Sequence, residues 1–357
     1  MVPNFVHMGL GSKVIFARGS VARLSSELEA AGRRRALLLS TPGQRRKIEA
    51  IAQSLGPLCV GAFSDAKMHT PLSVTELAVD IAHNVSADCV VSFGGGSAIG
   101  LGKAISFRTD LFHLAIPTTY SGSEMTPIIG ETANGEKKTR RNTKILPKTV
   151  IYDVDLTLSV PAMVLASSGL NAIAHGLEAL YWPECGPIVR FMAAEGIGSL
   201  FHSLVQVVAT PEDRNSRTAA LYGSWLCGSC LGMAPMALHH KLCHVLGGSF
   251  DLPHSETHAA LLPHTAAYNA TVTPDATKIL IATIGHEDPA LAFYELGKSL
   301  GIQRSLQALG MKASDLRRAA DLVLENRYEN PRPVTRSSIL QLLQRAYRGD
   351  PPLIEAA

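Results

Sequence analysis

The sequence predicts a two-domain α/β protein: an N-terminal dinucleotide-binding domain, with a parallel sheet flanked by helices, and an all-α C-terminal domain. Short β-rich runs alternate with amphipathic segments through residues 1–155. One of these runs ends in a glycine-rich turn, and long apolar segments of helical period follow from Ser159 onward. The chain of 357 residues exceeds the ~250–300 at which single cores stop growing. We therefore expect domains at 1–158 and 159–357.

The N-terminal alternation predicts individual elements. Buried apolar runs predict strands at 36–40, 58–64, 88–93 and 113–119, and amphipathic spacing predicts helices at 44–55, 73–85 and 97–107. In the second half, apolar segments of helical period lie at 162–181, 188–208, 217–232 and 313–325. Pro161 is placed to open the first of these long helices.

Composition excludes several classes of protein. The chain is 46% hydrophobic and 18% charged, with a net charge of +3, which does not indicate a disordered or nucleic-acid-coating protein. No signal peptide and no run of ~18 uninterrupted apolar residues is visible, so we expect a cytoplasmic protein outside the membrane. The scattered cysteines are expected to be reduced. Cys227 and Cys230 form a CxxC in an apolar helical context, which favours buried structural thiols.

A glycine-rich turn joins the strand expected at 88–93 to the helix that follows. Gly94, Gly95, Gly96 and Ser97 stand at this junction. Glycine lets a ligand approach the backbone closely, and the free N–H groups at a helix start suit a pyrophosphate. The pattern is not the GxGxxG of the usual dinucleotide fold. We nevertheless expect this turn to bind the phosphates of a nicotinamide cofactor.

Further cofactor contacts are expected where neighbouring strands end. Thr118, Thr119 and Ser123 lie in the polar loop IPTTYSGSEMTP, and open α/β sheets bind ligands at the carboxyl ends of their strands. Ser40 and Thr41 stand where NAD-binding folds often carry an acidic residue. Because no carboxylate would repel a 2′-phosphate there, we expect either NADH or NADPH to bind.

A basic segment precedes the domain boundary. It carries Lys137, Lys138, Arg140, Arg141, Lys144 and Lys148. A solvated loop is one interpretation, and attraction of an anionic cofactor or substrate is the other. On the second interpretation Lys148 belongs with the cofactor-binding residues.

Histidines are concentrated in one window of the second half. Six of the 13 lie within it: His239, His240, His244, His254, His258 and His264. His240 and His244 are four residues apart and share a helix face, as do Asn171 and His175. We expect both pairs to converge with His254 on one pocket.

Two chemistries fit this histidine group. His175, His240 and His254 are suitable ligands for a divalent metal. Alternatively, the imidazoles bind anions and relay protons without a metal. The fourth position is Asn171, whose neutral amide is a poor transition-metal ligand, so we expect that a metal is not required.

The sequence resembles the iron-containing (group III) alcohol dehydrogenase family in four motifs. These are the GGGS turn, the PTT…GSE loop, the pair Asn171 and His175, and the spacing of His240, His244 and His254. This resemblance spans the chain to the NPRPV segment and implies a dehydroquinate synthase-like architecture. The family's metal ligands would fall on Asn171, His175, His240 and His254. Asn171 replaces the family's aspartate, and Gly100 replaces the aspartate that usually ends GGGSxxD.

The departures, above all HHKLCHVLGGSFDLPHSETHA, resemble one branch of that family. The branch resemblance implies a homodimer that reduces the carbon–carbon double bond of maleylacetate, a small dianion, to 3-oxoadipate in aromatic-compound catabolism. For this reaction we expect His244 to donate a proton, and His240 and His254 to hold the developing oxyanion and a carboxylate. Asn171 and His175 are expected to contact the substrate.

Three other functions compete with this interpretation. The first is a metal-dependent alcohol or aldehyde dehydrogenase of the same family. The second is a lyase or cyclase of the related dehydroquinate synthase group, which uses NAD transiently. The third, a non-catalytic binding protein, is disfavoured by two polar loops and a histidine cluster in one chain.

Overall fold

A computed structural model describes residues 7–133, 136–182, 184, 186–325 and 328–354. By their internal contacts the residues form two compact units, Gly9–Val160 and Pro161–Ala357. The units divide after Val160, whereas the sequence predicted a boundary just before Ser159. His7 and Met8 belong to the helical unit and not to the N-terminal one.

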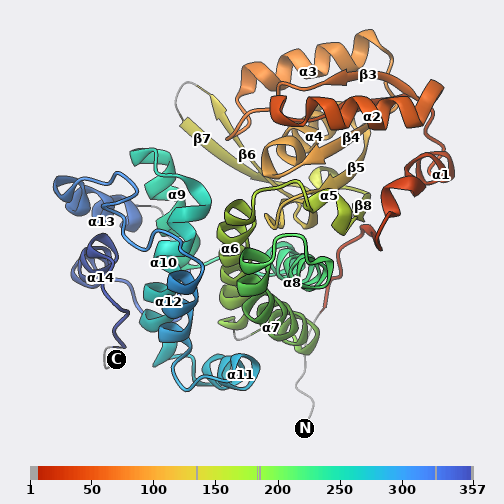
Figure 1. Ribbon diagram of the computed structural model, residues 1–357. Helices are drawn as coiled ribbons and strands as arrows, with labels where there is room; N and C mark the ends of the chain where they lie inside the picture. The colour runs from red at the N-terminus through yellow and green to blue at the C-terminus, as the bar shows by residue number, and fades with distance from the viewer. Residues whose placement is uncertain (1–6, 134–135, 183, 185, 326–327, 355–357) are drawn as a thin grey trace. The chain divides into compact units, whose positions relative to one another are not determined.

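The first unit is built on a six-stranded parallel sheet with the order β1-β8-β5-β4-β2-β3 (Figure 1). Its strands are β1 (Lys13–Phe16), β2 (Ala36–Leu39), β3 (Cys59–Phe63), β4 (Cys89–Gly94), β5 (Phe112–Pro117) and β8 (Thr149–Tyr152). The apolar runs expected as strands become β2 to β5. The sheet order brings β2 and β5 to either side of β4, so the loops after all three strands share one edge.

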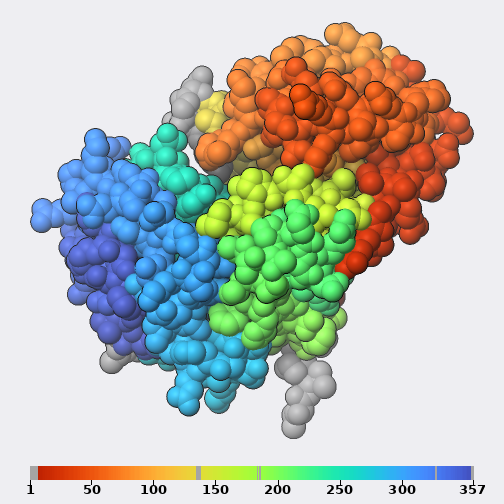
Figure 2. All heavy atoms as spheres, in the orientation of Figure 1, coloured from red at the N-terminus to blue at the C-terminus, as the bar shows by residue number. Residues whose placement is uncertain are grey.

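Helices cover both faces of this sheet because its strands are apolar on both sides. They are α1 (Leu24–Ala30), α2 (Arg45–Leu55), α3 (Leu72–Asn84), α4 (Gly96–Thr109) and the short α5 (Val154–Thr157). Leu38 and Val91 share one core with α1 and α2, whereas Leu37 and Val90 share another with α3 and α4. Successive strand residues thus point to opposite faces. In the space-filling view, the red and orange atoms of this unit pack side by side on the face shown (Figure 2).

The basic segment before the boundary is partly a strand, and its cations Lys138, Arg140, Arg141 and Lys144 are exposed, which agrees with the solvated interpretation but not with a loop. β6 (Ile128–Ala133) and β7 (Glu136–Arg141) form an antiparallel hairpin. Arg140 lies over the Phe107 ring at 5.9 Å, and Lys144 pairs with Asp110 at 2.8 Å. These two cations therefore already have partners within the first unit.

The second unit is entirely helical in its described residues, as expected. Its helices are α6 (Ala162–Leu180), α7 (Pro187–Ala209), α8 (Arg214–Met233), α9 (Leu238–Phe250), α10 (His254–Ala270), α11 (Pro274–Ile284), α12 (Pro289–Ser299), α13 (Leu316–Leu324) and α14 (Arg336–Arg348). Apolar side chains of α9, α10, α13 and α14 form one core. Cys227 and Cys230 are free thiols buried in α8, as the sequence predicts.

One helix qualifies the expectation that no segment could cross a membrane. α7 is long and apolar enough to do so by length and composition alone, and 44% of its most apolar window is buried in the protein. A core helix of a soluble protein passes the same test, and α7 packs against α6 and α8.

Candidate active site

The turn between β4 and α4 has the shape of a phosphate cradle. Gly94 has a φ of 137°, a conformation that side chains disfavour. A Cβ at Gly95 would lie 2.9 Å from Thr119 Oγ1, so only glycine fits without displacing that hydroxyl. The first N–H groups of α4 have no partner within the helix. The residues present therefore fit the pyrophosphate of a dinucleotide.

Other predicted cofactor residues surround this turn. The Thr118 N–H donates to the Gly94 carbonyl at 3.0 Å, which ties the loop after β5 to the turn after β4. Thr41 follows β2, the strand on the other side of β4. The structure thus brings Thr41, Thr118 and the glycine turn to one sheet edge.

Lys148 does not belong to this group, and including it was wrong. Lys148 immediately precedes β8, and its N–H donates to the carbonyl of His113, near the start of β5. In a parallel sheet the amino ends of the strands lie at the edge opposite to the carboxyl ends. From the sequence, Lys148 can be placed next to a strand. The edge of the sheet at which that strand begins cannot be predicted from it.

A buried lysine, missed in the sequence, supports the loop after β5. Lys103 on α4 is fully buried, and its Nζ donates to Ser123 Oγ at 3.2 Å and to Thr126 Oγ1 at 2.8 Å. Burial lowers the pKa of Lys103 to about 7. The hydrogen bond from Lys103 therefore fixes the side chain of Ser123, which is expected to contact the cofactor.

The departure at Gly100 has a steric basis. A Cβ at Gly100 would lie 2.6 Å from Thr70 Oγ1, so the family's usual aspartate cannot fit unless Thr70 moves. Thr70 is buried and, like His69, has a positive φ. The strained loop thus occupies the space that an aspartate side chain would need.

In the helical unit, three helices bring the predicted histidines together. α6 carries Asn171 and His175, α9 carries His240 and His244, and α10 begins at His254. The rings of His175 and His240 stack with centroids 5.0 Å apart, and those of His240 and His244 are 6.2 Å apart. His258 connects His240 with His254, because its ring centroid lies 5.1 Å from that of His240 and 4.6 Å from that of His254.

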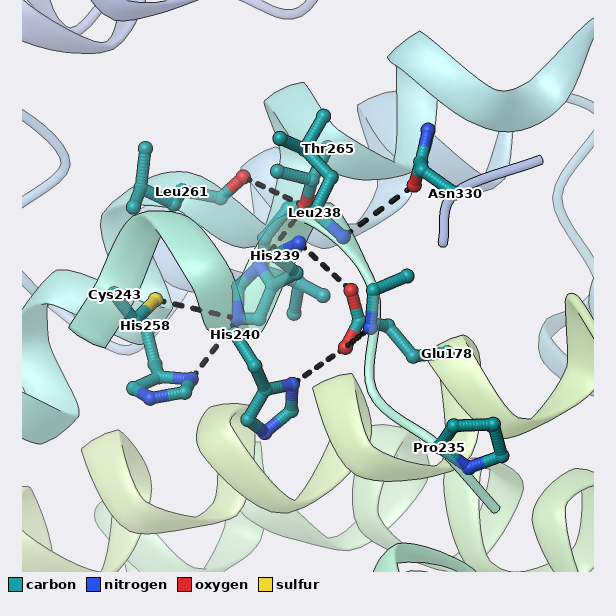
Figure 3. A network of polar contacts seen from close by, with 12 residues as sticks. Glu178, Pro235, Leu238, His239, His240, Cys243, His258, Leu261, Thr265 and Asn330 are labelled. Carbon is teal, nitrogen blue, oxygen red and sulfur yellow. Dashed lines mark hydrogen bonds and ion pairs between the residues drawn. The ribbon is translucent and has the colours of Figure 1, made fainter. Parts of the chain in front are cut away.

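Glu178 organises this group and was missed in the sequence. Its fully buried carboxylate accepts from the N–H groups of Ala237 and His239, at 3.0 and 2.7 Å, and from His240 Nδ1 at 2.6 Å (Figure 3). A carboxylate is favourable at a helix N-terminus, here the start of α9. Glu178 follows His175 by one helical turn, and that spacing was the available signal.

Several buried atoms of the site lack a protein partner. Within the described part of the chain, no hydrogen bond reaches Asn171 Oδ1, His175 Nδ1 or His240 Nε2. Buried polar atoms are normally paired, so three orphans on neighbouring side chains indicate a place for a ligand or water. His240 Nδ1 is committed to Glu178, which leaves Nε2 as the nitrogen available for chemistry.

Burial separates the histidines into two kinds. Desolvation, followed by the charges of neighbouring rings, holds the pKa of His175, His239 and His258 well below the usual range. These rings are therefore neutral at physiological pH. His244 is exposed and His254 is half-buried. His264 is buried on the same helix as His254, and burial lowers its pKa to about 4.

Two of the predicted metal ligands, His175 and His240, stack with ring centroids 5.0 Å apart. Among the described residues, one group of three His, Cys, Asp or Glu side chains has donor atoms all within 4.8 Å of one another, and it is His239, Cys243 and His258. His175, His240 and His254 do not form such a group, and Asn171 adds only a neutral amide. The reaction proposed below is therefore written with the protein's own side chains, and its independence of a metal is part of that proposal.

A parallel sheet with a glycine cradle and a helical unit with clustered imidazoles are features of dinucleotide-dependent oxidoreductases. Comparison with known proteins places the chain in a family: residues 11–154 match the model of iron-containing alcohol dehydrogenases, and residues 165–347 match the C-terminal model of the Fe-containing alcohol dehydrogenase family. The chain belongs to the iron-containing alcohol dehydrogenase family, which confirms the resemblance seen in the sequence and its fold.

Several of the most similar relatives carry the name maleylacetate reductase. Maleylacetate reductase from Sphingobium indicum is 51% identical, over 98% of this chain and 99% of its own. The crystal structure of maleylacetate reductase from Agrobacterium tumefaciens has a TM-score of 0.95 and 49% identity, covering 98% of this chain and all of that one. Sulfoacetaldehyde reductase from Bifidobacterium kashiwanohense, solved with NAD⁺, shares the fold at a TM-score of 0.89 and 21% identity, covering 98% of this chain and all of its own.

Proposed function

We infer that this oxidoreductase reduces the carbon–carbon double bond of maleylacetate to 3-oxoadipate with NADH or NADPH, as a step in the breakdown of aromatic compounds. The observation that carries the proposal is the set of buried, unpartnered atoms on Asn171, His175 and His240. They suit a polar substrate in a site that lacks the family's aspartate. The shared name of relatives at about half identity over nearly the whole chain supports the same substrate.

The substrate is a dianion whose ketone is conjugated to an alkene. When bound, the reduced nicotinamide supplies a hydride to the carbon β to the ketone, and negative charge develops on the ketone oxygen. His240 keeps Nδ1 on Glu178 and presents Nε2 to that oxygen, to which a proton on Nε2 can be donated. His254 holds a carboxylate, and Asn171 and His175 complete the substrate contacts.

The α carbon must then receive a proton. The neutral rings of His175, His239 and His258 carry no spare proton, because their pKa values lie well below the usual range. His244 lies beside His240 and is exposed, so solvent can reprotonate it after each turnover. We therefore assign proton donation to His244.

Cofactor binding is assigned to the first unit. Gly94, Gly95, Gly96 and Ser97 would hold the pyrophosphate, with Thr118, Thr119 and Ser123 beside it. Thr41 would contribute no carboxylate near the ribose, which would permit NADPH as well as NADH. The chemistry given to the imidazoles needs no metal.

We also infer a cytoplasmic homodimer. α7 exposes large apolar side chains, with Phe191 71% and Ile188 44% accessible. Contiguous apolar surface is typical of subunit interfaces. Light scattering after size exclusion measures the oligomeric state, and a monomer would contradict this part of the proposal.

The decisive assay is loss of NADH and NADPH absorbance with maleylacetate, compared with simple aldehydes and ketones. We expect oxidation of the cofactor with maleylacetate and formation of 3-oxoadipate. Turnover of alcohols or aldehydes alone, dependent on an added divalent metal, would instead identify a metal-dependent alcohol dehydrogenase. A product formed without net cofactor oxidation would indicate a lyase or cyclase.

A further inference from the structure

Behind the imidazoles assigned to the substrate lies a second set of donor atoms that the proposed reaction does not use. His239 and Cys243 lie one turn apart on α9, and His258 comes from α10. His239 Nε2 lies 2.9 Å from His258 Nδ1 and 3.7 Å from Cys243 Sγ (Figure 3). All three side chains are buried, and their donor atoms all lie within 4.8 Å of one another.

Thr265 orients the central ring of this set. The Thr265 hydroxyl donates to the carbonyls of Leu261 and Leu262, both at 3.1 Å, so its oxygen is left to accept from His239 Nδ1 at 2.9 Å. The proton of a neutral His239 therefore stays on Nδ1, and the lone pair of Nε2 points to Cys243 and His258. A second hydrogen bond of this kind is what fixes the ring orientation of metal-ligating histidines.

We propose that His239 Nε2, Cys243 Sγ and His258 Nδ1 form a binding site for a thiophilic divalent cation such as Zn²⁺. The two-nitrogen, one-sulfur donor set is of the kind that zinc prefers. Three protein donors leave the fourth tetrahedral position for water. The half-buried His254 ring, 4.6 Å from His258, marks the side on which the ion enters.

The observed spacing is close to that of a zinc site. Tetrahedral geometry with ordinary zinc bond lengths places a nitrogen and a sulfur about 3.6 Å apart and two nitrogens about 3.3 Å apart. The observed distance from Cys243 Sγ to His239 Nε2, 3.7 Å, already agrees. The two imidazole nitrogens, 2.9 Å apart, must separate by a few tenths of an ångström.

Binding of the ion displaces two protons from the donor atoms, one from Cys243 and one from His258. The Cys243 thiol loses its proton to the solvent, and the cation offsets the cost of the buried thiolate. His258 now donates from Nδ1 to His239, so that proton must leave Nδ1 for the ion to bind. His258 Nε2, buried and without a partner among the described residues, is the vacant position on the same ring that takes it up. One proton is released for each ion bound.

This site shares no side chain with the family's ligand positions. The family's ligands would be Asn171, His175, His240 and His254, none of which offers sulfur. A thiolate ligand is therefore the signature that separates the two sites. The proposal does not depend on maleylacetate being the substrate, because its readout is spectroscopic.

The test is Co²⁺ titration of the chelated full-length protein, kept reduced with a phosphine. We expect one equivalent to produce a near-ultraviolet thiolate-to-cobalt charge-transfer band. Cys243→Ser should abolish the band, whereas Cys227→Ser, at another buried cysteine, should retain it. Thr265→Val should weaken Co²⁺ binding about 10–100-fold, because it removes the hydrogen bond that orients a ligand.

X-ray absorption of the zinc-loaded wild-type protein is the second measurement and requires no variant. One sulfur and at least two imidazole nitrogens around the ion would support the site. Coordination by nitrogen and oxygen only would overturn it. So would a charge-transfer band that survives Cys243→Ser in a folded protein, or the absence of any band in the wild type.

Discussion

Replacing Glu178 by glutamine tests whether one buried carboxylate holds the catalytic histidine in position. Its Oε2 accepts from Ala237 N–H and His240 Nδ1, and its Oε1 accepts from His239 N–H. Glutamine has almost the same shape but only one acceptor oxygen. If the amide oxygen takes the Oε2 position, its NH2 group faces the His239 N–H, and two donors oppose each other.

The expected magnitude follows from these contacts. Glu178→Gln loses one of three hydrogen bonds, leaves a buried N–H unpaired, and removes the negative charge that strengthened the other two. Leaving a buried donor unsatisfied costs about 1–3 kcal/mol, so the variant should fold with a lower melting temperature. Without the charge, His240 Nδ1 is bonded to a neutral amide oxygen, so His240 is held less strongly and is a weaker donor to the substrate. Loss of one oxyanion donor costs about 10²–10³ in kcat, and we expect a decrease of this size.

Steady-state kinetics with saturating NADH, together with thermal unfolding, measures both effects. Glu195→Gln is the control, because Glu195 is exposed on α7 and outside the site. We expect KM for maleylacetate to change much less than kcat, since the charge on the ketone oxygen develops only during reaction. A folded Glu178→Gln enzyme with wild-type kcat would refute the assignment of His240 and Glu178 as a functional pair.

Four other predictions address separate parts of the proposal. His244→Ala should fold normally and lose about 10²–10⁴-fold in kcat, as expected for a general acid, and near-normal turnover in rapid-mixing or steady-state assays would contradict its role. Thr41→Asp should raise KM for NADPH selectively through repulsion of the 2′-phosphate, and equal losses with both cofactors would show that Thr41 lies away from the ribose. Exhaustive chelation should leave maleylacetate reduction intact, with little gain from Fe²⁺ or Zn²⁺; activity that vanishes and returns with one divalent metal would make the enzyme metal-dependent. Asn171→Asp should increase metal retention while raising KM for the dianionic substrate.

Most of the fold could be predicted from local patterns of apolar residues, because these patterns follow directly from which side chains are buried. The apolar runs that became β2, β4 and β5 are buried on both faces, the run that became the edge strand β3 is partly buried, and the long segments of the second half repeat with helical period. The β6–β7 hairpin lacked such a signal. Its second strand, Glu136–Arg141, reads EKKTRR, without apolar alternation, and its pairing with β6 comes from backbone hydrogen bonds.

The site was only partly predictable for a related reason. His240, His244 and His254 stand out by residue type and spacing within one window. Glu178 has a role in the site only because the start of α9 lies beside it. Ala237, which caps α9, is 59 residues further along the chain. Lys148 was misplaced because strand order and direction, which decide the edge of the sheet that a residue reaches, depend on pairings between distant segments.

The position of β1 has a consequence for synthesis of the protein. β1 leaves the ribosome before the other strands of that sheet, yet among the described residues its one neighbour in the sheet is β8, the last strand of that unit. Ser12 Oγ donates to the Pro147 carbonyl across 135 residues of chain. Closing so long a loop is slow, and a chain grows at only about 5–20 residues per second. A nascent or truncated chain that ends before β8 thus leaves both β1 and the edge of β5 unpaired, and such edges are prone to aggregate.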